Sequence, residues 1–257
     1  MLTIIKIGGN VINEESKLKE FLRLFSQYPG QKILVHGGGR EATKLCQTLG
    51  IETKMIDGRR VTDRETLEVV TMVYAGLINK RIVSMLQDLG CNALGLTGAD
   101  AHTIPAKRRQ PSPIDYGFVG DILEERINTP FIINQLKENI TPVFSAICYE
   151  PNGTLLNCNA DSVAASLAEA CARDNTVHLV YCFEKPGVLA DVDDESSLIP
   201  LITKSNFEYL CSIGTISDGM LPKVSNALKA LERGVAQVRI CNAFNLLNDT
   251  GTIIGAI

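Results

Sequence analysis

Runs of apolar residues alternate along the chain with segments that have helical spacing of apolar positions. The runs, which predict β-strands, cover 2–7, 32–36, 93–96, 114–119, 141–147, 177–182 and 236–241. The predicted helices cover 15–28, 40–49, 62–89, 129–139, 160–172, 205–212 and 219–233. Strands that are apolar almost throughout, separated by helices, are typical of a parallel sheet covered on both faces. We therefore expect an α/β fold around a largely parallel sheet.

Two of the predicted helices have clear end signals. The segment Thr62–Glu65 is typical of a capping box, in which Glu65 reaches back to the N–H of Thr62. Helix 219–233 keeps one apolar stripe and ends before Gly234. The composition changes near 173–176, which predicts a lobe boundary there. We expect an N-terminal lobe (1–175) and a C-terminal lobe (176–257) that share one continuous sheet.

Composition excludes several classes of function. The 257 residues carry 25 basic and 29 acidic side chains, and no basic block is longer than Lys107–Arg109, so a nucleic-acid partner is not expected. Eight cysteines form no Cys-x-x-Cys pair and the three histidines are scattered, so no metal site is predicted. No signal peptide is recognisable, and no stretch approaches the ~20 apolar residues of a membrane span. We expect a cytoplasmic protein without a membrane partner.

Two glycine turns stand directly after apolar runs and carry the first functional signal. Lys6-Ile7-Gly8-Gly9 closes the first run, and Gly37–Gly39 closes the second. A strand that ends in glycines and leads into a helix offers free backbone N–H groups and a helix dipole to phosphate or carboxylate. Lys6 interrupts an apolar strand and can meet phosphate at its carboxyl end. Two such turns predict two anionic ligands.

The second turn admits two other interpretations. Gly37-x-Gly39-x-x-Ala42 with Asp57 twenty residues after Gly37 fits a dinucleotide fingerprint, which would indicate a nicotinamide-dependent oxidoreductase. The dinucleotide interpretation gives no role to Lys6–Gly9, however. A plain tight turn between strand and helix is the remaining alternative.

Three further segments carry candidate chemistry. Arg59-Arg60 offers a bidentate fork for a carboxylate if it lies beside a pocket. Segment 157–161 holds two asparagines and an aspartate ahead of a helix, and capping explains only one of these three residues. Lys223 lies in a first helical turn, where the dipole disfavours a cation, so it is a candidate for binding an anion.

Taken together, these segments closely resemble the amino acid kinase family, and within it the N-acetylglutamate kinases. The resemblance runs from Lys6 to the C-terminus with the motifs in order. It implies an αβα sandwich whose N-terminal lobe holds an acylglutamate and whose C-terminal lobe holds ATP. The implied activity is ATP-dependent phosphorylation of the side-chain carboxylate of N-acetyl-L-glutamate, the second step of arginine biosynthesis. Because that carboxylate is ionised at pH 7, the reaction needs no general base.

The resemblance also implies roles for individual residues. Lys6 and Lys223 would contact the transferring phosphoryl group, and Asp161 would organise these lysines. The residues implied for the acceptor are Gly38, Gly39, Arg60, Asn157 and Asn159. Those implied for the nucleotide are Gly8, Gly9, Glu184, Lys185, Pro186, Gly187, Val188, Leu189, Thr215, Ile216 and Ser217. Mg²⁺ is expected to accompany ATP.

The chain departs from the family pattern in two places. In segment 182–187, Glu184 stands where relatives usually carry aspartate, and Lys185 is added. The first predicted strand begins at Leu2, which leaves no room for the N-terminal helix of arginine-regulated relatives. We therefore expect an arginine-insensitive homodimer. The sequence leaves open whether the acyl group is acetyl or a larger one such as succinyl.

Overall fold

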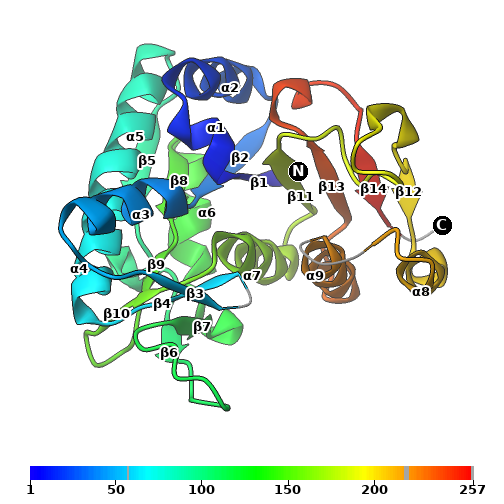
Figure 1. The fold of residues 1–257 in the computed structure, drawn as a ribbon. Coiled ribbons are helices and arrows are strands. Elements are labelled where there is room, and N and C mark those ends of the chain that lie inside the picture. The colour runs from blue at the N-terminus through cyan, green and yellow to red at the C-terminus, as the bar shows by residue number, and fades with distance from the viewer. Residues whose placement is uncertain (57, 217–219, 256–257) are drawn as a thin grey trace.

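A twisted eight-stranded sheet forms the centre of the protein, whose computed structural model describes residues 1–56, 58–216 and 220–255 (Figure 1). In sheet order the strands are β12 (Leu201–Ile202), β14 (Thr252–Ile254), β13 (Gln237–Asn242), β11 (Val177–Phe183), β1 (Leu2–Ile7), β2 (Gln31–His36), β8 (Thr141–Ser145) and β5 (Ala93–Leu96). All neighbours are parallel except β13 and β14. The predicted α/β fold with a mostly parallel sheet is confirmed.

Helices cover both faces of this sheet, so the predicted αβα sandwich is also confirmed (Figure 1). On one face lie α1 (Gly9–Asn13), α2 (Glu15–Gln27), α3 (Gly39–Thr48) and α5 (Asn79–Asp88). On the other lie α6 (Thr129–Lys137), α7 (Ala160–Ala172) and α9 (Leu221–Glu232), while α8 (Lys204–Ser212) packs near β12. The central strands are apolar because both of their faces are buried, as in β1, where five of six residues are fully buried.

One long helix runs from Arg64 to Asp88 and contains α4 (Arg64–Thr71), a π-helical segment (Met72–Ile78) and α5. Its N-cap is Asp63, whose side chain accepts a hydrogen bond from Thr66 N at 2.8 Å. The predicted capping box at Thr62 is therefore wrong. The N–H of Thr62 donates instead to Tyr116 O, a partner far away in the sequence.

The same helix corrects the expectation about membrane spans. Arg64–Asp88 is the one helix in the described part of the chain that is long and apolar enough to cross a bilayer by length and composition. Such a result is weak evidence, because core helices pass the same test. Val70, Val73 and Ile82 are buried in the hydrophobic core of this protein.

Short two-stranded antiparallel sheets near the carboxyl ends of the central strands were not predicted. They pair β3 (Lys54–Ile56) with β4 (Arg59–Val61), β6 (Ala106–Arg108) with β7 (Gly120–Ile122), and β9 (Ile147–Tyr149) with β10 (Leu155–Asn157). The strand predicted over 114–119 is wrong, because that segment makes only isolated bridges at Gly117 and Val119. The run 141–147 divides between β8 and β9. The lobe boundary at 175/176 stays a prediction.

Candidate active site

A lysine and an aspartate form an ion pair at the carboxyl edge of the sheet. Lys6 is the penultimate residue of β1, and its Nζ lies 2.6 Å from Oδ1 of Asp161, in the first turn of α7. Both side chains are largely buried, at 13% and 19% exposure. Burial opposes ionisation of Asp161, but the attraction of Lys6, with a further contribution from Lys223, holds its pKa below the ordinary value. Asp161 is therefore a carboxylate at neutral pH.

Lys223 adds a second cation to this pair. It lies in the first turn of α9, and its ammonium stands 5.1 Å from the ring centre of Phe183. Burial lowers the pKa of Lys223 against the attraction of Asp161, and the charge of Lys6 lowers it further. Two lysines around one aspartate leave a net positive cluster, which can stabilise an anion.

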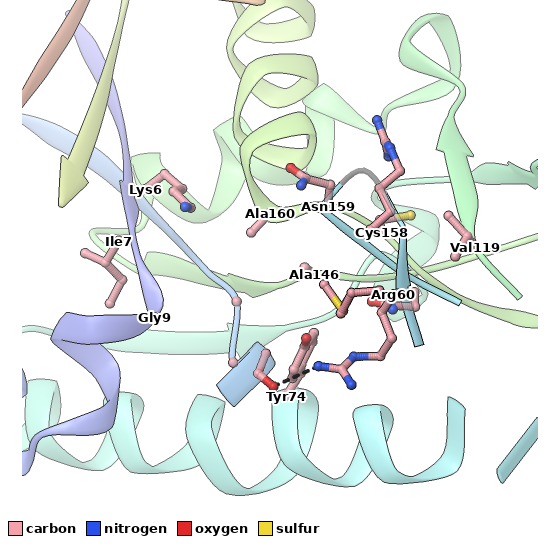
Figure 2. Close-up of a pocket in the computed structure, with 17 residues that line it drawn as sticks. Lys6, Ile7, Gly9, Arg60, Tyr74, Val119, Ala146, Cys158, Asn159 and Ala160 are labelled. Carbon is pink, nitrogen blue, oxygen red and sulfur yellow. Dashed lines mark hydrogen bonds between the residues drawn. The ribbon is translucent and has the colours of Figure 1, made fainter. Parts of the chain in front are cut away.

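Two cavities meet at Lys6. The first, of about 210 Å³, is lined by Gly37–Gly39, Arg60, Asn157 and Asn159, and in Figure 2 Lys6 and Arg60 lie on different sides of it. The second, of about 320 Å³, is lined by Gly8, Gly9, Glu184, Lys185 and Lys223. Lys6 and Gly9 line both. The structure thus brings all five of the predicted acceptor residues to one cavity and the second lysine to the other.

Arg60 is a buried guanidinium at the first cavity, with only 6% of its surface exposed. Its Nη2 donates to Gly39 O at 2.9 Å and to Thr43 Oγ1 at 2.7 Å. Its Nη1 has no hydrogen-bond partner among the residues that the structure describes. A buried guanidinium normally pairs with an anion, so Arg60 can donate hydrogen bonds to a ligand carboxylate. Tyr74, which the sequence did not single out, lines the cavity beside it (Figure 2).

Gly38 is the N-cap of α3 and packs closely against the long helix. A Cβ on Gly38 would lie 2.4 Å from Cδ1 of Ile78 and 2.8 Å from Cδ1 of Tyr74. The second turn therefore needs glycine at this position for close approach, whatever its ligand.

We expect Gly38→Ala to lower the free energy of unfolding by about 1–3 kcal/mol, since the added methyl overpacks the contact with Ile78 and Tyr74. Urea denaturation measures the change. Gly39→Ala is the matched control, because a Cβ at Gly39 meets nothing closer than 3.7 Å. Equal stability of the two variants would contradict the packing argument.

The first turn offers fewer free donors than its two glycines suggest. The N–H of Gly8 donates to Cys182 O at 3.1 Å and so extends the pairing of β1 with β11. Gly9 begins α1, and the first N–H groups of a helix have no acceptor within it. An anion at this turn would therefore meet the N–H of Gly9 and of the residues that follow, and not that of Gly8.

Comparison with known proteins agrees with this geometry. Residues 1–242 match the model of the amino acid kinase family. The chain belongs to that family. A curated relative from Phocaeicola vulgatus, named acetylglutamate kinase, is 49% identical and aligns over 98% of both chains. One from Methanopyrus kandleri with the same name is 37% identical over 98% of this chain and all of its own.

Solved structures of the amino acid kinase fold superpose over the whole chain. A Streptococcus mutans protein gives a TM-score of 0.80 at 29% identity, covering 100% of this chain and 99% of its own. Carbamate kinase from Giardia lamblia bound to AMP-PNP gives 0.71 at 14% identity, with 100% and 98% covered. At that identity the second match shows the fold alone.

The two asparagines of the family motif have separate structural tasks. Asn159 is the N-cap of α7, and its side chain accepts from the N–H groups of Asp161 and Ser162 at 2.8 and 3.1 Å. Asn157 Nδ2 donates to Thr62 Oγ1 at 3.0 Å and so connects β10 to the start of the long helix. Both residues line the first cavity, and their acceptor-binding roles stay predictions.

Only part of the predicted nucleotide segment reaches the second cavity. Glu184 and Lys185 line it, and Ser217 lies outside the described residues. Neither cavity at Lys6 is lined by Pro186, Gly187, Val188, Leu189, Thr215 or Ile216. Val188 N donates to Thr252 Oγ1 at 2.8 Å, and Ile216 is buried. The nucleotide roles of these residues stay predictions.

The sequence analysis missed Phe183 and Arg40, which line the second cavity. Arg40 directly follows the second glycine turn, and this position could have indicated that Arg40 belongs to the site.

Proposed function

We propose that the protein transfers the γ-phosphoryl group of ATP to the side-chain carboxylate of N-acetyl-L-glutamate, in the pathway of arginine biosynthesis. The observation that carries the proposal is the pair of cavities that share Lys6, one with the buried guanidinium of Arg60 and the other with Lys223. The curated relatives, several of which are named acetylglutamate kinase, support the same activity.

The chemistry requires charge neutralisation more than proton transfer. Arg60 would hold one carboxylate of the acceptor, and the reacting carboxylate would point toward Lys6 between the cavities. Lys6 and Lys223 would offset the charge of the phosphoryl group in the transition state. Asp161, ionised and 2.6 Å from Lys6, would hold the ammonium of that lysine at the junction. Catalysis then rests on positioning and electrostatics.

Mg²⁺ fits this site as part of the ATP substrate. The described residues contain no group of three or more His, Cys, Asp or Glu side chains that could hold a metal ion. Mg²⁺ commonly binds substrate phosphates together with one or two carboxylates and water. Glu184 brings a carboxylate to the second cavity, whereas Asp161 is already paired with Lys6. When bound, Mg²⁺ would supply further neutralisation of the phosphate charge.

An ADP-release assay with N-acetylglutamate, N-succinylglutamate and free glutamate tests the proposal. We expect release with N-acetylglutamate and none with free glutamate. Preference for the succinyl compound would retain the phosphoryl transfer and change the acyl group, and Arg59, which lines the first cavity, would then be the first residue to examine. Stabilisation of the protein by NAD(P) and not by ATP with Mg²⁺ would favour the oxidoreductase interpretation, which the comparisons do not favour.

The lowered pKa of Lys223 predicts how activity depends on pH. A cation is needed at this position, so kcat/KM for ATP should fall as pH rises through a pKa below the ordinary value of 10.5. Rates measured between pH 7 and 11 show where the decline lies. In Lys223→Arg the guanidinium stays charged, so the residual activity of this variant should lack the part of the decline that is due to Lys223.

We also propose a cytoplasmic, arginine-insensitive homodimer with no nucleic-acid or membrane partner. On the long helix, Met72 and Leu77 are exposed at 55% and 50% and are the candidates for the contact between protomers. Light scattering of the pure protein measures its mass in solution and so tests the oligomeric state. A monomer or a hexamer, or inhibition of the kinase reaction by arginine, would contradict this part of the proposal.

A further inference from the structure

An ion cluster joins α7 to α9 away from the two cavities. Arg233, immediately after α9, places Nη1 2.6 Å from Oε2 of Glu124 and 2.7 Å from Oε2 of Glu169. Glu169 lies within α7 with a side chain that is only 10% exposed, and Glu124 belongs to the 3₁₀ turn Glu124–Arg126. One guanidinium therefore connects three separate elements.

The same two helices carry the reactive cluster at their other ends. Asp161 lies in the first turn of α7 and Lys223 in the first turn of α9, close enough for Lys223 to lower the pKa of Asp161. Because Glu169 and Arg233 also meet, the helices run side by side in the same direction (Figure 1). At 1.5 Å per residue, the ion cluster lies about 12–15 Å along the helices from the reactive ends.

Both helices pack against the central sheet, α7 on β1 and β11 and α9 on β13, and the ion cluster joins the two helices directly to each other. Many of their buried residues are alanines: Ala164, Ala165, Ala168 and Ala170 in α7, and Ala227 and Ala230 in α9. Alanine side chains are short, so these positions form only low ridges on the helix surfaces. An ion cluster that includes a mostly buried carboxylate supplies a defined contact at one place along the axis.

We infer that Arg233 is a positioning residue, which sets the place of Lys223 relative to Lys6 and Asp161 through its contacts with Glu169 and Glu124. The inference rests on the proposed phosphoryl transfer. Misplacement of a reacting group by about 1 Å can lower a rate by about 100-fold. We therefore expect Arg233→Ala to lower kcat by about 10- to 100-fold. The KM for the acceptor should stay near its original value, because Arg60 is on a different element.

The test is a double-mutant cycle with Lys223. If Arg233 acts through Lys223, then Arg233→Ala should lower kcat in the original protein and have little further effect beside Lys223→Ala. Arg233→Lys should recover part of the loss, since an ammonium can keep one of the two contacts. The matched control is the neighbouring residue: Glu232→Gln removes an exposed ion pair with Lys204 that joins α9 only to α8, and it should leave kcat unchanged.

The other outcomes of this double-mutant cycle can be told apart from the expected one. An equal loss of kcat in both backgrounds would show a general structural role and overturn the inference, and so would an unaffected kcat in Arg233→Ala. If Arg233→Ala does not fold, then Glu169→Gln, which removes the charge but keeps the shape, replaces it in the same cycle and is judged by the same criterion. If the original protein releases no ADP with any acylglutamate, the proposed function fails, and this is seen before any variant is made.

Discussion

Lys223→Ala is expected to lower kcat by roughly 10²–10³ with the fold intact, since it removes one of two cations from the proposed site of phosphoryl transfer. Lys6→Ala should have an effect of the same size. The ammonium of Lys223 lies over the ring of Phe183 at the second cavity, on the same carboxyl edge of the sheet as Lys6. Steady-state ADP release at saturating ATP and acceptor measures the change.

Lys204→Ala is the control for this pair of variants. Lys204, the first residue of α8, forms an exposed ion pair with Glu232 at the end of α9 and lines neither cavity, so its loss should leave turnover unchanged. Lys6→Ala also leaves Asp161 buried without its partner, so its melting temperature needs to be compared with that of Lys223→Ala. Turnover within twofold of the original protein in either lysine variant would remove that lysine from the proposed transfer step.

Arg60→Ala is expected to raise the KM for the acceptor by about 10- to 100-fold, since a charge-assisted hydrogen bond contributes about 1.5–3 kcal/mol. Nη1 of Arg60, which has no hydrogen-bond partner among the described residues, is the group that would donate to the carboxylate, and Arg60 lines the first cavity. The KM for ATP should not change, because Arg60 does not line the second cavity. Acceptor titrations at fixed, saturating ATP measure the effect.

Arg60→Lys separates charge from geometry. A lysine keeps the positive charge but cannot present two parallel N–H donors, so its KM should lie between those of the original protein and of Arg60→Ala. It would also lose the contacts of Nη2 with Gly39 O and Thr43 Oγ1. A KM for ATP that rises as much as that for the acceptor would place Arg60 outside the acceptor site.

The sequence predicted the parts of the fold whose pattern is local and long. The strand predicted over 2–7 has the same bounds in the structure, as has the helix predicted over 160–172. Prediction from the sequence failed where a few residues pair with a distant segment. The three-residue strands β3 and β4 show no periodicity of their own, and Thr62 N donates to Tyr116, more than fifty residues away, so the capping box looked plausible locally.

The candidate site shows the same limit. Lys6, Asp161 and Lys223 could be proposed from motifs, and the structure places all three around one junction. No local signal pointed to Tyr74, which lies within an apolar helix, or to the contact of Arg233 with Glu169, whose residues are 64 positions apart. At Gly8 the motif predicted a free N–H for an anion, but in the structure this N–H donates to Cys182 O within the sheet.

A single ammonium shared by two cavities has a thermodynamic consequence. Lys6 attracts an anion on either side of it, and once one cavity holds its ligand, less of that attraction remains for the other. The two negatively charged substrates should therefore weaken each other's binding, and by linkage each does so by the same factor. Lys223, and the Mg²⁺ proposed to accompany ATP, would limit this antagonism. The affinity of the protein for both substrates together is then set by how much positive charge collects at their junction.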